Sequence, residues 1–166
     1  MDPRPRIEFW FDFTSTYSYP AAMRVEALAA AHAVEVDWRP FLLGPVFRRI
    51  GWEGPPLFIH QAKADYVWRD VKRRCRLHGL PFIRPAAFPL PSLRPLRVAT
   101  LGLGQPWIGG FCREVMHAGF GQARAIDSDE VLRPILQRLG LDPDAVLADA
   151  ASDATKAALR ARTDEA

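Results

Sequence analysis

The sequence predicts an α/β fold that opens with a βαβ unit and continues as a series of helices. Residues 7–13 alternate isoleucine and phenylalanine with other side chains, which is the period of a β-strand. An alanine-rich stretch follows with apolar residues every three or four positions, as in a helix, and residues 34–39 alternate again. A crossover of this length makes the two strands parallel and the connection right-handed. We therefore expect the first helix to begin at the carboxyl end of the first strand, where α/β sheets bind ligands.

Length, charge and hydropathy restrict the class of protein. The chain has 166 residues, enough for one domain, and its 22 basic and 19 acidic residues are too balanced to indicate nucleic-acid binding. No apolar run approaches the roughly 18 residues of a membrane span. The first residues lead into the strand pattern without the charged and apolar regions of a signal peptide, which predicts a cytoplasmic protein.

The first strand and the start of the first helix carry further signals. Trp10 lies on the side of the strand opposite the phenylalanines, which predicts burial on both faces, as in a central strand. Thr14, Ser15 and Thr16 supply hydroxyls of the type that cap helices. These signals predict a helix N-terminus directly after the strand.

The rest of the chain is predicted to be helical. Helical periodicity covers residues 59–78, 93–103, 107–116 and 131–139, and shorter helices open at Asp142 and Ser152. A two-stranded sheet beside so many helices is an incomplete α/β layer. We therefore expect further strands to complete the sheet, and this sequence does not contain them.

The two cysteines, Cys75 and Cys112, form neither a redox motif nor a zinc motif. They lie far apart inside helical patterns, which predicts small buried side chains. We expect no metal site and no dithiol chemistry from them.

Ser15 is the candidate active residue because it falls where a strand ends and a helix begins. Backbone amides at such a point are unpaired donors and the helix dipole is positive there, so an anion is stabilised. Residues 15–18 keep the spacing of a CxxC motif, with serine in place of both cysteines. A serine hydroxyl does not ionise without a base, but it can donate to a thiolate, and a bond of about 1.5–3 kcal/mol lowers a thiol pKa of ~8.5 by roughly one or two units. The thiol must then come from a cofactor; the alternative is that Thr14 and Ser15 only cap the helix.

Several segments resemble those of one known family. Residues 11–19, with the sequence FDFTSTYSY, resemble the FDF-x-S-P-x-S-Y signature of the 2-hydroxychromene-2-carboxylate isomerases, relatives of kappa-class glutathione transferases in the DsbA-like thioredoxin superfamily. Further matches follow in order over residues 38–44, 63–66, 77–82, 88–97 and 126–132. Their number and order extend the resemblance over essentially the whole chain.

The resemblance implies a thioredoxin-like fold of the DsbA/kappa type with a large all-helical insertion. Residues 1–43 correspond to the N-terminal βαβ half of the thioredoxin-like domain, residues 44–150 to the helical insertion, and residues 151–166 to a helix that returns to that domain. The family continues into a strand with a cis-proline, a further strand and a final helix. We therefore expect the C-terminal part of the sheet to be missing from this chain.

The resemblance also implies a glutathione-dependent isomerase of aromatic catabolism. In the family, the serine that Ser15 matches holds a glutathione thiolate, which adds to an unsaturated substrate, permits rotation about the former double bond and then leaves. Ser15 is accordingly the predicted catalytic residue, and Ser15, Tyr17 and Lys63 are the predicted glutathione contacts. Trp38 is the predicted contact for the substrate, an aromatic 2-hydroxy acid or pyruvate derivative. The alternatives are core packing for Trp38 and an ordinary exposed side chain for Lys63.

Three other functions stay open on the sequence. A kappa-like glutathione transferase or a DsbA-like oxidoreductase would use the same scaffold, although the absence of CxxC argues against dithiol redox chemistry. A truncated, non-catalytic remnant is the third alternative, and its exposed strand edge would allow pairing into a homodimer. The expected partners are glutathione and a small-molecule substrate, and neither nucleic acid nor a membrane.

Overall fold

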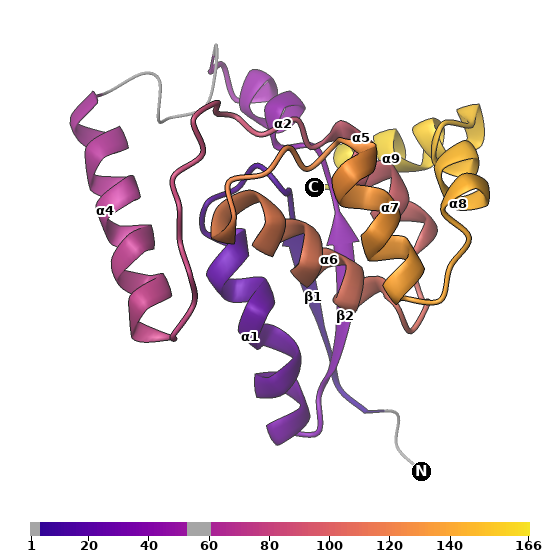
Figure 1. Ribbon diagram of the computed structural model, residues 1–166, viewed down its shortest axis with the longest axis horizontal. Coiled ribbons are helices and arrows are strands. Elements are labelled where there is room, and N and C mark those ends of the chain that lie inside the picture. Colours follow the sequence, from indigo (N-terminus) through magenta and orange to yellow (C-terminus); the bar gives the residue numbers. More distant parts are fainter. Residues whose placement is uncertain (1–3, 53–60) are drawn as a thin grey trace.

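A parallel strand pair with one connecting helix forms the first part of the fold (Figure 1). The computed structural model describes residues 4–52 and 61–166. The three elements are β1 (Arg6–Phe11), α1 (Ser18–Ala31) and β2 (Glu35–Pro40). The strands pair in parallel, with Phe9 opposite Trp38. This arrangement confirms the βαβ unit that the sequence predicts.

Helices make up most of the described chain after β2. Their bounds are α2 (Leu43–Arg49), α4 (Gln61–Leu77), α5 (Leu93–Leu101), α6 (Ile108–Met116), the π-helical turn η1 (His117–Gly121), α7 (Asp129–Arg138), α8 (Pro143–Ala150) and α9 (Asp153–Glu165). The predicted helices are thereby confirmed, except that the predicted start at Ile59 lies outside the described residues. Of the helices that the structure describes, none is long and apolar enough to cross a membrane.

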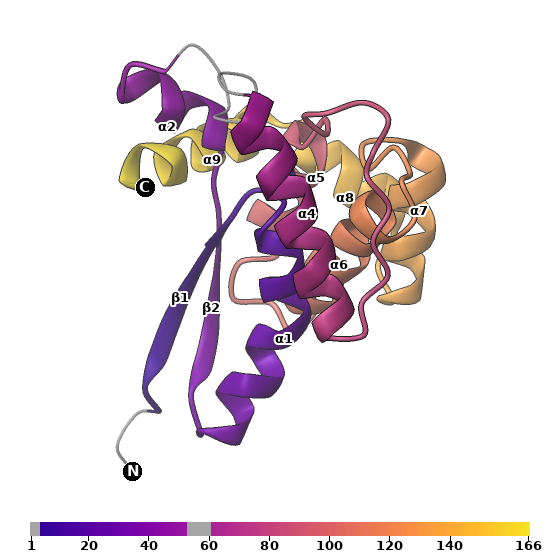
Figure 2. The same cartoon turned by 90° about the vertical axis from the view of Figure 1, so that its left-hand side faces the viewer.

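The main core lies between the strand pair and the helices on one of its faces (Figure 2). Phe11 and Trp38 of the strands are buried there and meet edge to face, with ring centroids 5.6 Å apart. Phe13 extends this contact to Phe111 of α6, at a centroid distance of 6.1 Å. α5 and α9 also contact β2, and Leu159 of α9 belongs to the same cluster. One core therefore combines side chains from residues 1–43, 44–150 and 151–166, the three ranges that the family resemblance distinguishes.

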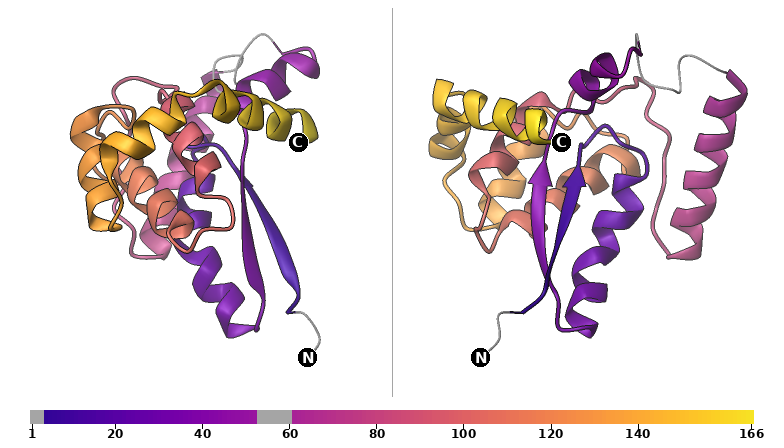
Figure 3. Two further views of the ribbon diagram at one scale, coloured as in Figure 1. Left: turned by 90° about the vertical axis from the view of Figure 1, so that its right-hand side faces the viewer. Right: turned by 180° about the vertical axis from the view of Figure 1, so that it is seen from behind.

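The described helices do not cover the opposite face of the strand pair (Figure 3). Charged side chains from both strands lie on this face. The ion pairs on this face are Arg6–Glu35, Glu8–Arg39 and Asp37–Arg39, with nitrogen–oxygen distances of 3.0, 2.9 and 2.7 Å. We call these five residues the charged ladder. Trp10 is partly buried beside the Arg39 guanidinium, which lies 5.9 Å from its ring centroid. The prediction of burial on both faces is therefore wrong for this side, because its charged groups are partly exposed and pair with one another.

The chain turns between β1 and α1 before the helix begins. α1 starts at Ser18, with Tyr17 at the N-cap position and no side-chain cap. The Ser15 amide donates to the Asp12 carbonyl oxygen at 2.9 Å, and the Ser18 amide donates to the Ser15 carbonyl oxygen at 3.2 Å. Ser15 Oγ accepts from the Ser18 amide only at a long 3.4 Å. The prediction that residues 14–16 cap the helix is wrong, because these residues form the turn that precedes it.

Candidate active site

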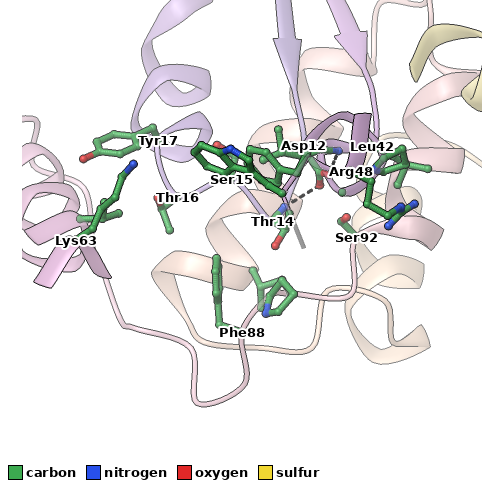
Figure 4. Close-up of a pocket in the computed structure, with 18 residues that line it drawn as sticks. Asp12, Thr14, Ser15, Thr16, Tyr17, Leu42, Arg48, Lys63, Phe88 and Ser92 are labelled. Carbon is green, nitrogen blue, oxygen red and sulfur yellow. Dashed lines mark hydrogen bonds between the residues drawn. The ribbon is translucent and has the colours of Figure 1, made fainter. Parts of the chain in front are cut away.

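A pocket of about 570 Å³ opens at the carboxyl ends of the two strands (Figure 4). Its walls come from the turn after β1, from α2 and the residues before it, from α4, and from residues 88–92. The polar or charged lining residues are Asp12, Thr14, Ser15, Thr16, Tyr17, Arg48, Lys63 and Ser92; leucine, valine, proline, phenylalanine and tryptophan side chains supply most of the rest. Pockets of roughly 300–1,000 Å³ with a few polar groups among apolar walls bind small molecules. The site is therefore suited to a small organic ligand.

Ser15 lies in the wall of this pocket, at the turn that leads from β1 into α1 (Figure 4). The residue is partly exposed. Within the described part of the chain its hydroxyl accepts the long bond from Ser18 and has no acceptor for its own hydrogen. That hydrogen is thus available to a ligand in the pocket. The structure places Ser15 where the sequence expects an active residue, and its catalytic role stays a prediction.

Tyr17 and Lys63 lie on the same side of the pocket (Figure 4). Tyr17 is 40% exposed, and its hydroxyl donates to Asp70 Oδ2 at 2.9 Å. Partial burial, together with this hydrogen bond, raises the pKa of Tyr17 to about 12. Lys63 Nζ lies 5.6 Å from the ring centroid of Trp52, which is a cation–π distance. Tyr17 therefore offers its ring to a ligand and Lys63 offers a positive charge, but glutathione binding by either residue stays a prediction.

Trp38 is not among the residues that line this pocket. It is 3% exposed, and its indole nitrogen donates to Glu26 Oε1 at 3.1 Å. Its ring packs edge to face against Phe9 and Phe11, with centroid distances of 5.2 and 5.6 Å. The predicted contact with substrate does not fit this position, because the ring is buried on the core face of the strand pair. Core packing, the alternative role, describes it instead.

Asp12 is a pocket residue that sequence reasoning missed. It is 2% exposed, yet Oδ1 accepts from the Thr14 amide and Oδ2 from the Leu43 amide, each at 2.9 Å. Burial raises the pKa of Asp12, while hydrogen bonds from these amides and from the Ser92 hydroxyl oppose the rise. A carboxylate placed between two phenylalanines in a strand pattern is the signal that could have identified it.

Other lining residues come from segments that are far apart in sequence. Arg48 of α2 lies at the end of the pocket opposite Lys63 (Figure 4). Trp52 and the pair Phe88–Pro89, which a cis peptide bond joins, supply apolar wall. Of these residues, only Phe88 and Pro89 lie in a segment that resembles the family, and the fold brings all of their segments together.

The two cysteines lie away from this pocket. Cys75 and Cys112 are fully buried, as the sequence predicts. Burial raises the pKa of both thiols, that of Cys75 to about 11. Neither residue lines the pocket, so a thiolate at Ser15 has to come from a bound molecule.

The fold and the position of the pocket agree with a known class of proteins. A family model described as a DSBA-like thioredoxin domain matches residues 6–166. The chain therefore belongs to the family of DsbA-like thioredoxin domains, which confirms the predicted thioredoxin-like fold.

Within that class the chain is similar to 2-hydroxychromene-2-carboxylate isomerases, as its motifs predict. It is 27% identical to the enzyme of that name from Pseudomonas putida over 140 residues, which cover 84% of this chain and 68% of the enzyme. A solved structure of 2-hydroxychromene-2-carboxylate isomerase matches with a TM-score of 0.87 at 26% identity, over 96% of this chain and 78% of that one. Glutathione S-transferase kappa 1 from Caenorhabditis elegans is 33% identical over 89 residues, which cover 53% of this chain and 38% of the transferase. The predicted resemblance to an isomerase family is thereby confirmed.

Proposed function

We propose that this chain is a glutathione-dependent isomerase that acts on 2-hydroxychromene-2-carboxylate or a related aromatic 2-hydroxy acid or pyruvate derivative. The observation that carries the proposal is the Ser15 hydroxyl, which lies in a pocket of about 570 Å³ and has no acceptor for its hydrogen among the described residues. Because neither Cys75 nor Cys112 reaches the pocket, Ser15 is suited to hold a thiol that a ligand brings.

Glutathione fits the residues that line the pocket. It is a tripeptide with a thiol on its middle residue and a carboxylate at each end. Ser15 lies between two cations, Lys63 and Arg48, which occupy opposite ends of the pocket (Figure 4). The hydroxyl and the two charges therefore match the order of groups along the tripeptide. Bound glutathione would supply a thiolate nucleophile that adds to the unsaturated substrate and later leaves.

The chain's own residues would hold and activate that thiol. Ser15 donates a hydrogen bond to the sulfur, and a charge-assisted bond of about 1.5–3 kcal/mol favours the thiolate over the thiol. Lys63 adds a positive charge, which favours an anion on its side of the pocket. Trp52 and Phe88 offer apolar surface against which an aromatic ring packs. Because glutathione is the thiol of the reducing cytosol, we place the reaction in the cytoplasm.

The glutathione dependence of isomerisation tests this proposal. The purified chain is incubated with 2-hydroxychromene-2-carboxylate, and ultraviolet absorbance follows the reaction with glutathione, without it, or with S-methylglutathione, which has no free thiol. We expect turnover only with glutathione. We also expect tryptophan fluorescence to change as glutathione is titrated, because Trp52 lines the pocket. Equal turnover in all three reactions, or no fluorescence response and no turnover, would contradict the proposal.

A kappa-like glutathione transferase is the second candidate, and the 33% identity to the nematode transferase over 89 residues favours it. An electrophile that takes up glutathione directly, such as a chloronitrobenzene, separates the two candidates. Conjugation that is much faster than isomerisation would favour the transferase. Isomerisation without measurable conjugation would favour the isomerase.

A further inference from the structure

Three segments of the pocket wall converge on one buried side chain, that of Asp12 (Figure 4). Its Oδ1 accepts from the Thr14 amide, directly before Ser15, and its Oδ2 accepts from the Leu43 amide at the start of α2. The hydroxyl of Ser92, at the N-cap position of α5, also interacts with this carboxylate and favours its ionised form. The carboxylate therefore connects the turn after β1 with the start of α2, beside the start of α5.

We propose that Asp12 is a positioning residue: its carboxylate fixes the turn that carries Ser15 relative to the start of α2, so that the Ser15 hydroxyl meets the ligand sulfur. This inference rests on the proposed function for the identity of the ligand. The Ser15 amide also donates to the Asp12 carbonyl oxygen at 2.9 Å, so Asp12 holds the turn through its backbone as well. The side chain is the part of Asp12 that reaches the α2 wall.

The start of α2 depends on side chains from other elements. Its N-cap residue, Leu42, provides no side-chain cap. The Leu42 amide donates to Thr163 Oγ1 of α9 at 3.0 Å, and the Leu43 amide donates to Asp12 at 2.9 Å. Thr163 thus attaches α2 to α9, whereas Asp12 attaches it to the Ser15 turn. Without the Asp12 acceptor, the turn that carries Ser15 would no longer be held at a fixed distance from the start of α2, although α2 would stay attached to α9.

Positioning and charge predict opposite effects of Asp12 on a bound thiol. A negative charge near a thiolate disfavours the ionised sulfur, so removal of the Asp12 charge alone would lower the pKa of the bound thiol. Removal of the positioning contact withdraws the Ser15 donor from the sulfur, which raises that pKa. The direction of the change therefore separates the two roles.

Asp12→Asn tests the proposal, with Asp37→Asn on the charged ladder as the matched control. Asparagine has nearly the same volume as aspartate. Its NH₂ group, however, would face one of the two backbone amides that donate to the carboxylate, and a donor cannot accept that hydrogen bond. Without ligand, we expect hydrogen exchange of the Thr14 and Leu43 amides to become about tenfold faster or more in Asp12→Asn and to stay unchanged in Asp37→Asn. In the glutathione complex, we expect the ultraviolet absorbance of the thiolate to titrate about one pH unit higher in Asp12→Asn than in the wild type.

A lower thiolate pKa in Asp12→Asn, or unchanged exchange of both amides, would overturn the positioning role. If the wild-type chain binds no glutathione, the proposed function fails, but the exchange measurement uses no ligand and still decides the role of Asp12. If circular dichroism finds Asp12→Asn unfolded, Ser92→Ala replaces it, since that variant removes a hydroxyl that favours the ionised carboxylate and keeps the carboxylate itself. In Ser92→Ala we expect faster hydrogen exchange of the two amides and a higher thiolate pKa, each by a smaller factor than in Asp12→Asn. If neither the exchange nor the titration changed, the proposal would be overturned.

Discussion

Asp12 and Asp37 belong to the same βαβ unit but lie in opposite environments. Asp12, at the carboxyl end of β1, is buried and accepts hydrogen bonds from two backbone amides. Asp37, on the outward face of β2, pairs with Arg39 at 2.7 Å, and its side chain is 31% exposed. Water can replace the partners of Asp37 but has little access to those of Asp12. At the pocket end, two backbone amides therefore depend on one carboxylate, whereas on the charged ladder the side chains mainly pair with one another.

Removal of each carboxylate in turn tests this difference between Asp12 and Asp37 most directly. Asp12→Ala leaves two backbone amides, those of Thr14 and Leu43, without their acceptor, so we expect the free energy of unfolding to fall by about 2–5 kcal/mol. Asp37→Ala is expected to lower it by about 1 kcal/mol or less, because partly exposed ion pairs contribute little. Urea denaturation followed by circular dichroism measures both. Equal losses of unfolding free energy in the two variants would show that the buried carboxylate stabilises the fold no more than the partly exposed one.

The pocket end is also where we expect activity to be lost. Ser15→Ala should reduce kcat/KM of the glutathione-dependent isomerisation by about 10- to 100-fold, the value of one charge-assisted hydrogen bond in the transition state. Ser18→Ala, in the first turn of α1, and Asp37→Asn, on the charged ladder, are controls with little expected change. Initial rates over a range of glutathione concentrations provide the measurement. Wild-type rates in Ser15→Ala would remove Ser15 from the mechanism.

The hydroxyls of Thr163 and Thr14 provide a second comparison, with smaller expected effects on stability. Thr163 Oγ1 accepts from the Leu42 amide at 3.0 Å and donates to the Leu159 carbonyl oxygen at 2.9 Å, whereas Thr14 Oγ1 is buried without a partner among the described residues. Valine keeps the shape of threonine in both places. We expect Thr163→Val to lower the free energy of unfolding by about 1–2 kcal/mol, and Thr14→Val to leave it unchanged or raise it by up to about 1 kcal/mol. The opposite ranking in urea denaturation would contradict these assignments.

The smallest expected difference lies in the pH dependence of stability. Burial raises the pKa of Asp12 above its ordinary value of 3.8, so the folded chain binds this proton more tightly than the unfolded chain does. The resulting stabilisation is complete below pH 3.8 and is lost as the pH rises through the raised pKa. A hydrogen bond from Lys156 lowers the pKa of Asp153, and the stabilisation from that group is present above pH 3.8 and lost as the pH falls.

Unfolding free energies measured from acidic to neutral pH test both signs. The value for the wild type minus that for Asp12→Asn should decrease as the pH rises. The value for the wild type minus that for Asp153→Asn should increase over the acidic part of the same range. Parallel curves for the wild type and Asp12→Asn would show that burial does not shift the titration of Asp12.

Local signals predicted most of the helices and strands. Asp142 and Ser152 act as the N-caps that their sequence positions predict: their side chains accept from the amides of Asp144 at 2.9 Å and Thr155 at 3.2 Å. The start of α1 was misplaced, because hydrogen bonds to Asp12 hold Thr14 and Ser15 in a turn before the helix begins.

The candidate site was predicted in part. Ser15, Tyr17 and Lys63 all line the pocket, as the family resemblance implies. Trp38 does not, because an aromatic residue in a strand suits a core as well as a binding site, and here its indole nitrogen finds Glu26 inside the protein. Asp12 was missed, since its partners lie outside the strand pattern that surrounds it.

The sequence by itself determined the strand and helix periods, the N-caps at Asp142 and Ser152 and the serine motif, because these depend on residues only a few positions apart. Tertiary structure decided which groups meet at the pocket. The Leu43 amide finds Asp12 at a separation of 31 residues, and the Leu42 amide finds Thr163 at a separation of 121. Partners at such separations are set by how the helices pack on the strand pair, and a local pattern carries no information about that packing.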